Sequence, residues 1–143
     1  MLYIESFFNR EYYMTPTELI ENFSYLMDWE DKYRYLIELG EHLPAMADEE
    51  KTPENKVEGC MSQVWISHTQ QEGKHYFKMD SDAHIVRGLE AILYILVNEK
   101  TSKEISELDI DGLFNELGLS EHLSPTRRNG FAGMVAKIKE VIK

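Results

Sequence analysis

Residues 63–79 read QVWISHTQQEGKHYFKM, and this stretch decides which class of fold the chain adopts. With the period of two of a strand, residues 63–69 place Val64, Ile66 and His68 on one side and Trp65, Ser67 and Thr69 on the other, and QQEG at 70–73 is typical of a tight turn. Residues 75–79 then resume a strand pattern that is rich in aromatic side chains. The stretch therefore predicts an antiparallel hairpin, and Val57–Gly59, just before it, is a candidate for a short third strand.

Two helices are predicted before the hairpin. Thr15-Pro16-Thr17-Glu18 is a capping box with proline at the first helical position. A second helix is expected to begin at Asp28 and to end at Pro44, and the polar residues 44–56 then form a loop. The apolar stripes predicted to be buried are Leu19, Ile20, Phe23, Leu26 and Met27 in the first helix, and Trp29, Tyr33, Leu36, Ile37 and Leu43 in the second.

More helices are predicted after the hairpin. Asp80-Ser81-Asp82 offers a cap for a helix over 83–98, which is apolar on most sides and is therefore expected to be central. The later helix signals are a capping box formed by Thr101 and Glu104, a short helix over 111–117 that Gly118 closes, and a last helix that opens at Ser124-Pro125.

This order predicts an α+β domain, in which a small three-stranded antiparallel sheet is packed with helices from both ends of the chain. We expect a single domain over residues 15–143. Residues 1–14 precede the first capping signal at Thr15, so we interpret them as a dispensable N-terminal extension.

Charge and composition restrict the kinds of partner. The chain has 143 residues and a net charge of −11, which argues against binding to a nucleic-acid backbone. The apolar run at 91–97 is too short to span a bilayer. We therefore expect a cytoplasmic protein without a nucleic-acid or membrane partner. Residues 125–143 carry five basic side chains and one acidic, which indicates either a solvated helix face or a positive field near a site.

The segment VEGCMSQVW at 57–65 contains the only cysteine, Cys60. A single cysteine excludes an intramolecular disulfide and a four-cysteine metal site, and it fits a reducing compartment. Gly59 allows the backbone to turn sharply, and polar residues follow, so the thiol is expected at a bend. These observations are compatible both with a reactive thiol and with an inert, buried one.

The five histidines, His42, His68, His75, His84 and His122, show no metal-binding spacing. His68 and His75 flank the predicted turn and either pair across the strands or are ordinary, half-exposed side chains. A catalytic pair of Cys60 with a histidine stays open, because such partners meet in space and not in sequence. Arg127 and Arg128 fall in the first turn of the last helix, where the helix dipole disfavours a cation, which hints at a further role.

Four separated segments, in this order, resemble the SufE family of sulfur-acceptor proteins. They are KYRYLIELGEHLP (32–44), ENKVEGCMSQVW (54–65), DSDAHIVRGLEAIL (80–93) and LSPTRRNGFAGMV (123–135). The resemblance covers residues 15–142. The family's usual core, G-C-Q-S-Q-V-W, has glutamine where this chain has Met61, which keeps the acceptor cysteine but changes the polar surroundings of its thiol.

The resemblance implies that Cys60 accepts sulfur. A pyridoxal-phosphate cysteine desulfurase, SufS-like, would hold sulfur as a persulfide on its own cysteine, and the Cys60 thiolate would attack that sulfur. The carrier would stimulate the desulfurase and pass the sulfur to a SufBCD-like scaffold that assembles iron–sulfur clusters. The resemblance implies no metal or organic cofactor in this chain, and it places Asp82 and Arg127 near the acceptor loop or docking face.

A carrier needs its thiol protected when idle and exposed when docked. We expect Gly59 to act as the pivot of the loop, and Val57, Met61, Val64 and Trp65 to form an apolar pocket for Cys60. Three alternatives stay open: a related branch that supplies tRNA or cofactor thiolation, an independent cysteine-dependent hydrolase or peroxidase, and an acidic adaptor with an inert thiol. We expect no independent enzymatic activity.

Overall fold

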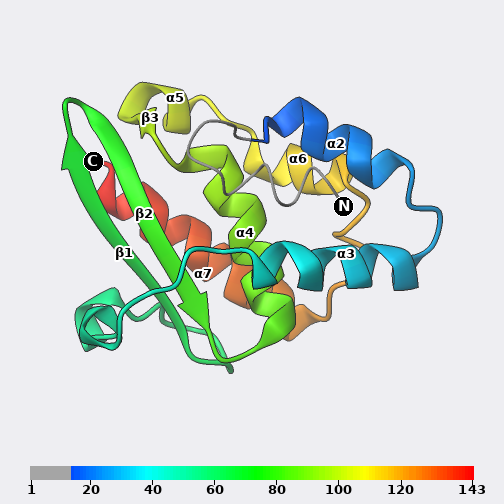
Figure 1. The fold of residues 1–143 in the computed structure, drawn as a ribbon, viewed down its shortest axis with the longest axis horizontal. Coiled ribbons are helices and arrows are strands. Elements are labelled where there is room, and N and C mark those ends of the chain that lie inside the picture. The colour runs from blue at the N-terminus through cyan, green and yellow to red at the C-terminus, as the bar shows by residue number, and fades with distance from the viewer. Residues whose placement is uncertain (1–13) are drawn as a thin grey trace.

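The computed structural model describes residues 14–143. Apart from Met14, which is buried in the core, the predicted extension lies outside the described residues. The elements follow in the order α2 (Pro16–Ser24), α3 (Trp29–Glu41), the 3₁₀ turns η1 (Asp48–Glu50) and η2 (Pro53–Asn55), β1 (Val64–Gln71), β2 (Lys74–Ser81), α4 (His84–Val97), β3 (Lys100–Thr101), α5 (Ser102–Ser106), α6 (Ile110–Glu116) and α7 (Pro125–Val141) (Figure 1).

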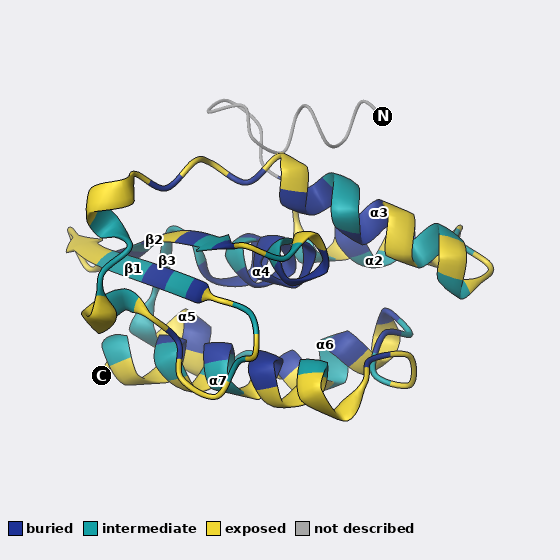
Figure 2. Ribbon diagram, turned by 90° about the horizontal axis from the view of Figure 1, so that it is seen from below, coloured by how far each residue is buried: buried dark blue, intermediate teal, exposed yellow. Residues whose placement is uncertain are grey.

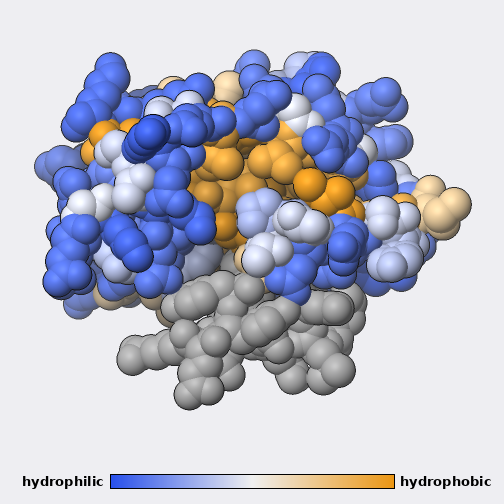
Figure 3. Space-filling model, turned by 90° about the horizontal axis from the view of Figure 1, so that it is seen from above, coloured by the Kyte–Doolittle hydropathy of each residue, from blue (hydrophilic) through white to orange (hydrophobic). Residues whose placement is uncertain are grey.

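The sheet and α4 lie between two groups of helices. Figure 2 shows α2 and α3 on one side of this middle level and α5, α6 and α7 on the other. The central place predicted for the helix after the hairpin is confirmed, because α4 is buried along most of its length. The face seen in Figure 3 has apolar side chains at its centre, framed by hydrophilic ones.

The predicted hairpin is confirmed, with longer strands and a shorter turn than the sequence indicated. β1 and β2 pair antiparallel in a register that runs from Val64 opposite Ser81 to Gln71 opposite Lys74. The turn residues Glu72 and Gly73 both have positive φ, as a two-residue hairpin turn requires. The side chains buried on one face are Val64 and Ile66 from β1 and His75, Phe77 and Met79 from β2.

The third strand is not the one that the sequence indicated. The sheet order is β1-β2-β3, so the third strand is Lys100–Thr101 beside β2. Val57–Gly59 forms no strand, and only an isolated bridge joins Lys56 to Trp65. Past the short β3, a side chain occupies one donor on the edge of β2, because Phe77 N–H donates to Asn98 Oδ1 over 2.8 Å.

Most predicted helix starts are confirmed. Capping boxes form at Thr15 and Thr101, and Asp28 and Ser124 cap α3 and α7. The predicted acidic cap of α4 is wrong, since its N-cap is Ala83 without a side-chain hydrogen bond. The two aspartates on either side of Ser81 are used elsewhere, in an ion-pair cluster and in the loop that carries Cys60.

Two predicted apolar stripes are partly wrong. Met27 lies beyond the end of α2 and is 88% exposed, and Tyr33 is also exposed. Leu36 and Leu43 are buried as predicted, and the rest of the buried face of α3 is formed by Tyr35, Leu39 and Gly40. The face is rotated because α3 packs against α4 along this side.

His68 and His75 do pair across the strands. His75 is buried, and its Nδ1 lies 2.6 Å from His68 Nε2. Its Nε2 lies 2.6 Å from Ser102 Oγ, which donates its own proton to Ile142 O over 2.9 Å. Ser102 must therefore accept from His75 Nε2–H, so His75 Nδ1 accepts from His68 Nε2–H when both rings are neutral. This chain of hydrogen bonds ties the hairpin to the end of α7.

The histidine pair should make the fold sensitive to acid. Burial, and then His75, lowers the pKa of His68 below its ordinary value of 6.5. The contribution of this group to stability is present above about pH 6.5 and is lost as the pH falls through the lower folded-state pKa. His68→Gln should therefore show a weaker fall in unfolding free energy between about pH 7 and pH 5 in urea titrations. An identical fall in both proteins would contradict this assignment.

Candidate functional site

Cys60 lies on a loop between η2 and β1 that is held at both of its ends. Val57 N–H donates to Val64 O over 2.8 Å, which closes the loop on itself. Asp82 Oδ1 accepts from Gln63 N–H at 3.0 Å, and Asp82 N–H donates back to Gln63 O at 3.2 Å. We call residues 57–64 the Cys60 loop.

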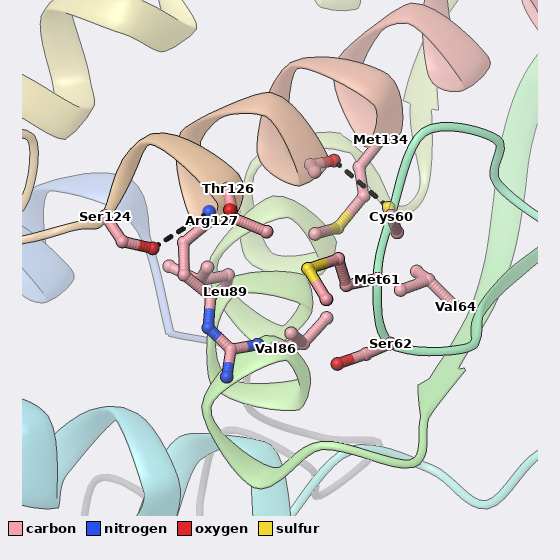
Figure 4. Close-up of a pocket in the computed structure, with 11 residues that line it drawn as sticks. Cys60, Met61, Ser62, Val64, Val86, Leu89, Ser124, Thr126, Arg127 and Met134 are labelled. Carbon is pink, nitrogen blue, oxygen red and sulfur yellow. Dashed lines mark hydrogen bonds between the residues drawn. The ribbon is translucent and has the colours of Figure 1, made fainter.

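Gly59 turns the Cys60 loop toward α7. Its φ is +85°, a conformation that favours glycine, and a side chain added there would meet no atom within 4 Å. The turn therefore requires glycine for its backbone angle and not for lack of space. Figure 4 shows Cys60 facing α7 from this loop. Val57–Gly59 cannot pair as a strand because the chain leaves the sheet here and rests on the helix.

Two glycines of α7 form the surface on which the loop rests. A Cβ added at Gly133 would lie 2.8 Å from the carbonyl oxygen of Glu58, and one added at Gly130 would lie 3.3 Å from Cys60 Sγ. The thiol itself lies 3.6 Å from Gly130 O and donates its proton to it. The sequence analysis missed this pair. Its signal is two glycines three residues apart inside a helix, where each lowers helix propensity by about 1 kcal/mol.

The thiol borders a pocket of about 450 Å³ between the Cys60 loop, α4 and the first half of α7 (Figure 4). Apolar side chains of both helices form much of its wall, and the one charged lining side chain among the described residues is Arg127. The residues that line the pocket are Cys60, Met61, Ser62, Val64, Val86, Leu89, Ser124, Thr126, Arg127, Gly130 and Met134.

The pocket differs from the predicted one. Val64 and Met61 line it as expected, although Met61 is 87% exposed. Trp65 does not line it, because neighbouring strand residues point to opposite faces and Val64 takes the inner one. The Trp65 ring instead lies under Lys51, whose Nζ is 5.4 Å from the ring centroid. Val57 is buried beneath the loop, beside Gly133.

The surroundings of Cys60 favour the protonated thiol. Burial is the largest cause that raises its pKa above the ordinary value of 9.0, and the carboxylates of Glu90 and Glu58 raise it further. Since the thiolate is the nucleophile, the seated cysteine is poorly reactive at neutral pH. The seated geometry thus keeps Cys60 as a protonated thiol and does not favour the reactive thiolate.

The predicted site residues are only partly together. Cys60 and Arg127 line the same pocket, and Gly59 directly precedes the cysteine. Arg127 N–H donates to the cap oxygen of Ser124 over 3.2 Å, and the Arg127 side chain extends along the pocket (Figure 4). Asp82 is exposed and outside the pocket, where it holds the end of the loop through Gln63. No histidine of residues 14–143 lines this pocket.

Two searches within residues 14–143 bear on the kind of site. No group of three or more His, Cys, Asp and Glu side chains is placed to hold a metal ion there. No helix in this range is long and apolar enough to cross a membrane. Fold and site together define a small α+β protein that presents one half-buried thiol on a loop that turns at a glycine.

Comparison with known proteins identifies the family. A SufE family model, described as an Fe-S metabolism associated domain, matches residues 17–142. An uncharacterised SufE-like protein of Rhizobium etli is 49% identical over 130 residues, which are 88% of each chain. Another from Rhizobium meliloti is 45% identical over 126 residues, 85% of this chain and 90% of that one. The chain therefore belongs to the SufE family, which is associated with iron–sulfur metabolism.

A solved structure shows the same fold. The solution structure of a hypothetical protein from Thermus thermophilus matches with a TM-score of 0.71 over 90% of this chain and 96% of that one. Its sequence is 18% identical, so the likeness concerns the fold alone.

We call Gly130 and Gly133, on which the Cys60 loop rests, the glycine seat. This contact predicts a substitution that should expose the thiol. Gly133→Ala should displace the Cys60 loop, because the new Cβ would press on the Glu58 carbonyl, while the helix gains up to about 1 kcal/mol of propensity. Iodoacetamide should then alkylate Cys60 several-fold faster than in the wild type, with little change in thermal stability. Ala132→Gly, at an exposed position of the same helix, is the control and should leave the alkylation rate unchanged. Equal rates in all three proteins would show that the seat does not protect the thiol.

Proposed function

We propose that this protein is a sulfur carrier that takes persulfide sulfur from a cysteine desulfurase onto Cys60. The observation that carries the proposal is the seated thiol: the one cysteine of the chain lies half-buried on a loop that turns at Gly59, beside a pocket with an apolar wall. Membership of the SufE family supports the link to iron–sulfur metabolism.

The transfer is a thiol exchange that needs no external oxidant or reductant. The Cys60 thiolate attacks the outer sulfur of the desulfurase persulfide, forming one S–S bond while the bond to the desulfurase cysteine breaks. That cysteine leaves as a thiolate, and Cys60 becomes the persulfide. A second exchange with an acceptor thiol releases the sulfur again. A lone cysteine suits this task, since a neighbouring thiol would close a disulfide and expel sulfide.

The raised pKa of the seated Cys60 implies a change on docking. A thiol protonated at rest resists capping and oxidation, but it has to reach the partner's active site and ionise there. We propose that docking moves the Cys60 loop outward about Gly59, with contact free energy offsetting the lost burial. Arg127 beside the pocket and Asp82 at the loop end belong, in this proposal, to the docking face.

The partners follow from the same proposal. The donor is a pyridoxal-phosphate enzyme of the SufS type, which this carrier stimulates, and the receiver is a SufBCD-like scaffold for iron–sulfur clusters in the cytoplasm. The seated geometry gives no support to an independent hydrolase or peroxidase, because no described histidine lines the pocket and the pKa of the thiol is raised rather than lowered.

Persulfide loading tests the carrier function. Incubated with a desulfurase and free cysteine, the protein should gain the mass of one or more sulfur atoms, and a reductant should remove them. Cys60→Ser should bind the desulfurase but gain no sulfur in intact-mass spectrometry. Sulfur on another residue, or no gain with any desulfurase of the source cell, would overturn the proposal.

The hinge at Gly59 offers a matched comparison. Gly59→Ala and Gly73→Ala both place a side chain at positive φ with no atom within 4 Å, so each should destabilise the fold by a similar amount, about 1 kcal/mol. Only Gly59→Ala restricts the Cys60 loop, and it should slow sulfur loading, whereas Gly73→Ala at the hairpin tip should not. A comparable loss of loading in both variants would assign the effect to stability and not to the hinge.

A further inference from the structure

Glu90 lies in the middle of α4 and is 0% exposed. Neither of its carboxyl oxygens has a hydrogen-bond partner among the described residues. Such a group is destabilising in a protein interior, because it gives up its bonds to water and gains none in return. Because the two carboxyl oxygens lack hydrogen bonds to any described residue, Glu90 costs stability, and we ask what function offsets this cost.

The charges around Glu90 are engaged with one another. Arg87 Nε lies 3.2 Å from Asp80 Oδ1, and Lys51 Nζ lies 3.1 Å from Asp80 Oδ2. Asp80 therefore forms ion pairs with both cations, although Arg87 Nε makes no hydrogen bond among the described residues. Burial, and then the negative charge of Asp80, raises the pKa of Glu90 well above its ordinary value, and Arg87 opposes this only in part. The group is neutral over a wider pH range than an exposed glutamate.

Glu90 also lies next to the Cys60 site. Val86 lies one helical turn before Glu90 on α4, and Leu89 directly precedes it. Both line the pocket that Cys60 borders. Glu90 is the largest electrostatic influence on the thiol, ahead of Glu58 on the loop. Thus one side of α4 contributes to the wall of the thiol's pocket while the adjacent position holds an unsatisfied acid.

We propose that Glu90 is a positioning residue for Cys60: its unpartnered carboxyl group favours the unseated position of the Cys60 loop, in which water reaches it. When the loop rests on α7, the carboxyl group stays dry. When the loop leaves, the side of α4 that carries Val86 and Leu89 is uncovered further, so that water reaches Glu90, and the group gains hydrogen bonds and ionises. The free energy released by hydration of Glu90 offsets part of the free energy lost when Cys60 is exposed. A docking partner therefore needs to contribute less contact free energy to unseat the loop.

The sign of the pH dependence follows from this linkage. An exposed glutamate has a pKa of about 4.3, and the buried one titrates well above that. The seated state therefore binds one more proton than the unseated state between these two values. Above about pH 4.3, each pH unit should raise the unseated population by up to tenfold, until the buried group also ionises. Acid should lock the loop in its seat.

The test measures Cys60 alkylation by iodoacetamide in the free protein between about pH 5 and pH 8. Each rate is divided by the thiolate fraction of that variant, taken from a separate titration by ultraviolet absorbance. The corrected rate should rise with pH in the wild type, by up to tenfold per unit. Glu90→Gln, which keeps the shape but cannot ionise, should lose this slope. Glu90→Leu should lose it too and react more slowly throughout.

Two controls separate this effect from simpler ones. Glu58→Gln removes the other carboxylate that acts on Cys60, but Glu58 is exposed, so the pH slope should persist. Low urea concentrations should change the corrected rate little if the loop opens locally, and steeply if alkylation requires global unfolding. Gly133→Ala, whose loop is expected to be displaced already, provides a reference rate for the unseated thiol.

Two results would overturn the proposal. One is an equal pH slope in Glu90→Gln and the wild type. The other is a Glu90→Leu protein that is more stable but whose Cys60 reacts at the wild-type rate, since Glu90 would then strain the core without acting on the loop. The proposal adds to the sulfur-carrier function, but these measurements use no desulfurase. A failure of sulfur loading would leave them interpretable.

Discussion

The enclosure of α4 is the constraint on which the rest of the domain depends. This helix packs against α3, against β2 and against α7, and it supplies part of the wall behind the thiol. Elements from both halves of the chain must close around it before either the sheet or the last helix has a complete core. Glu90 is an ionisable residue at the centre of this helix, so its charge state affects the packing of the whole domain and not of one surface.

The Cys60 site illustrates how a loop is kept in place without being fixed. Its ends are tied by backbone and Asp82 hydrogen bonds, but at Glu58 and Cys60 the loop rests on Gly133 and Gly130, which have no side chains. The thiol adds only a weak bond to a carbonyl oxygen. A contact of this kind covers the sulfur, and few contacts would break in the proposed movement of the loop.

Local signals in the sequence predicted much of the fold, and contacts between distant segments account for the errors. The capping boxes at Thr15 and Thr101 and the hairpin turn depend on neighbouring residues, so they were predictable. The third strand was misplaced because what prevents Val57–Gly59 from pairing is helix α7, more than 60 residues later in the chain. Cys60 was recognisable from its motif, whereas its seat and the influence of Glu90 come from tertiary contacts.

The side chain of Asn98 has a consequence for the behaviour of the protein at high concentration. A strand edge with free N–H groups is a template on which another chain can add, and β3 covers only the first two residues of β2. By accepting from Phe77 N–H, Asn98 occupies a donor that a foreign strand would need. With α4 packed against the same strand, this edge of the sheet is shielded from intermolecular pairing by one amide and one helix.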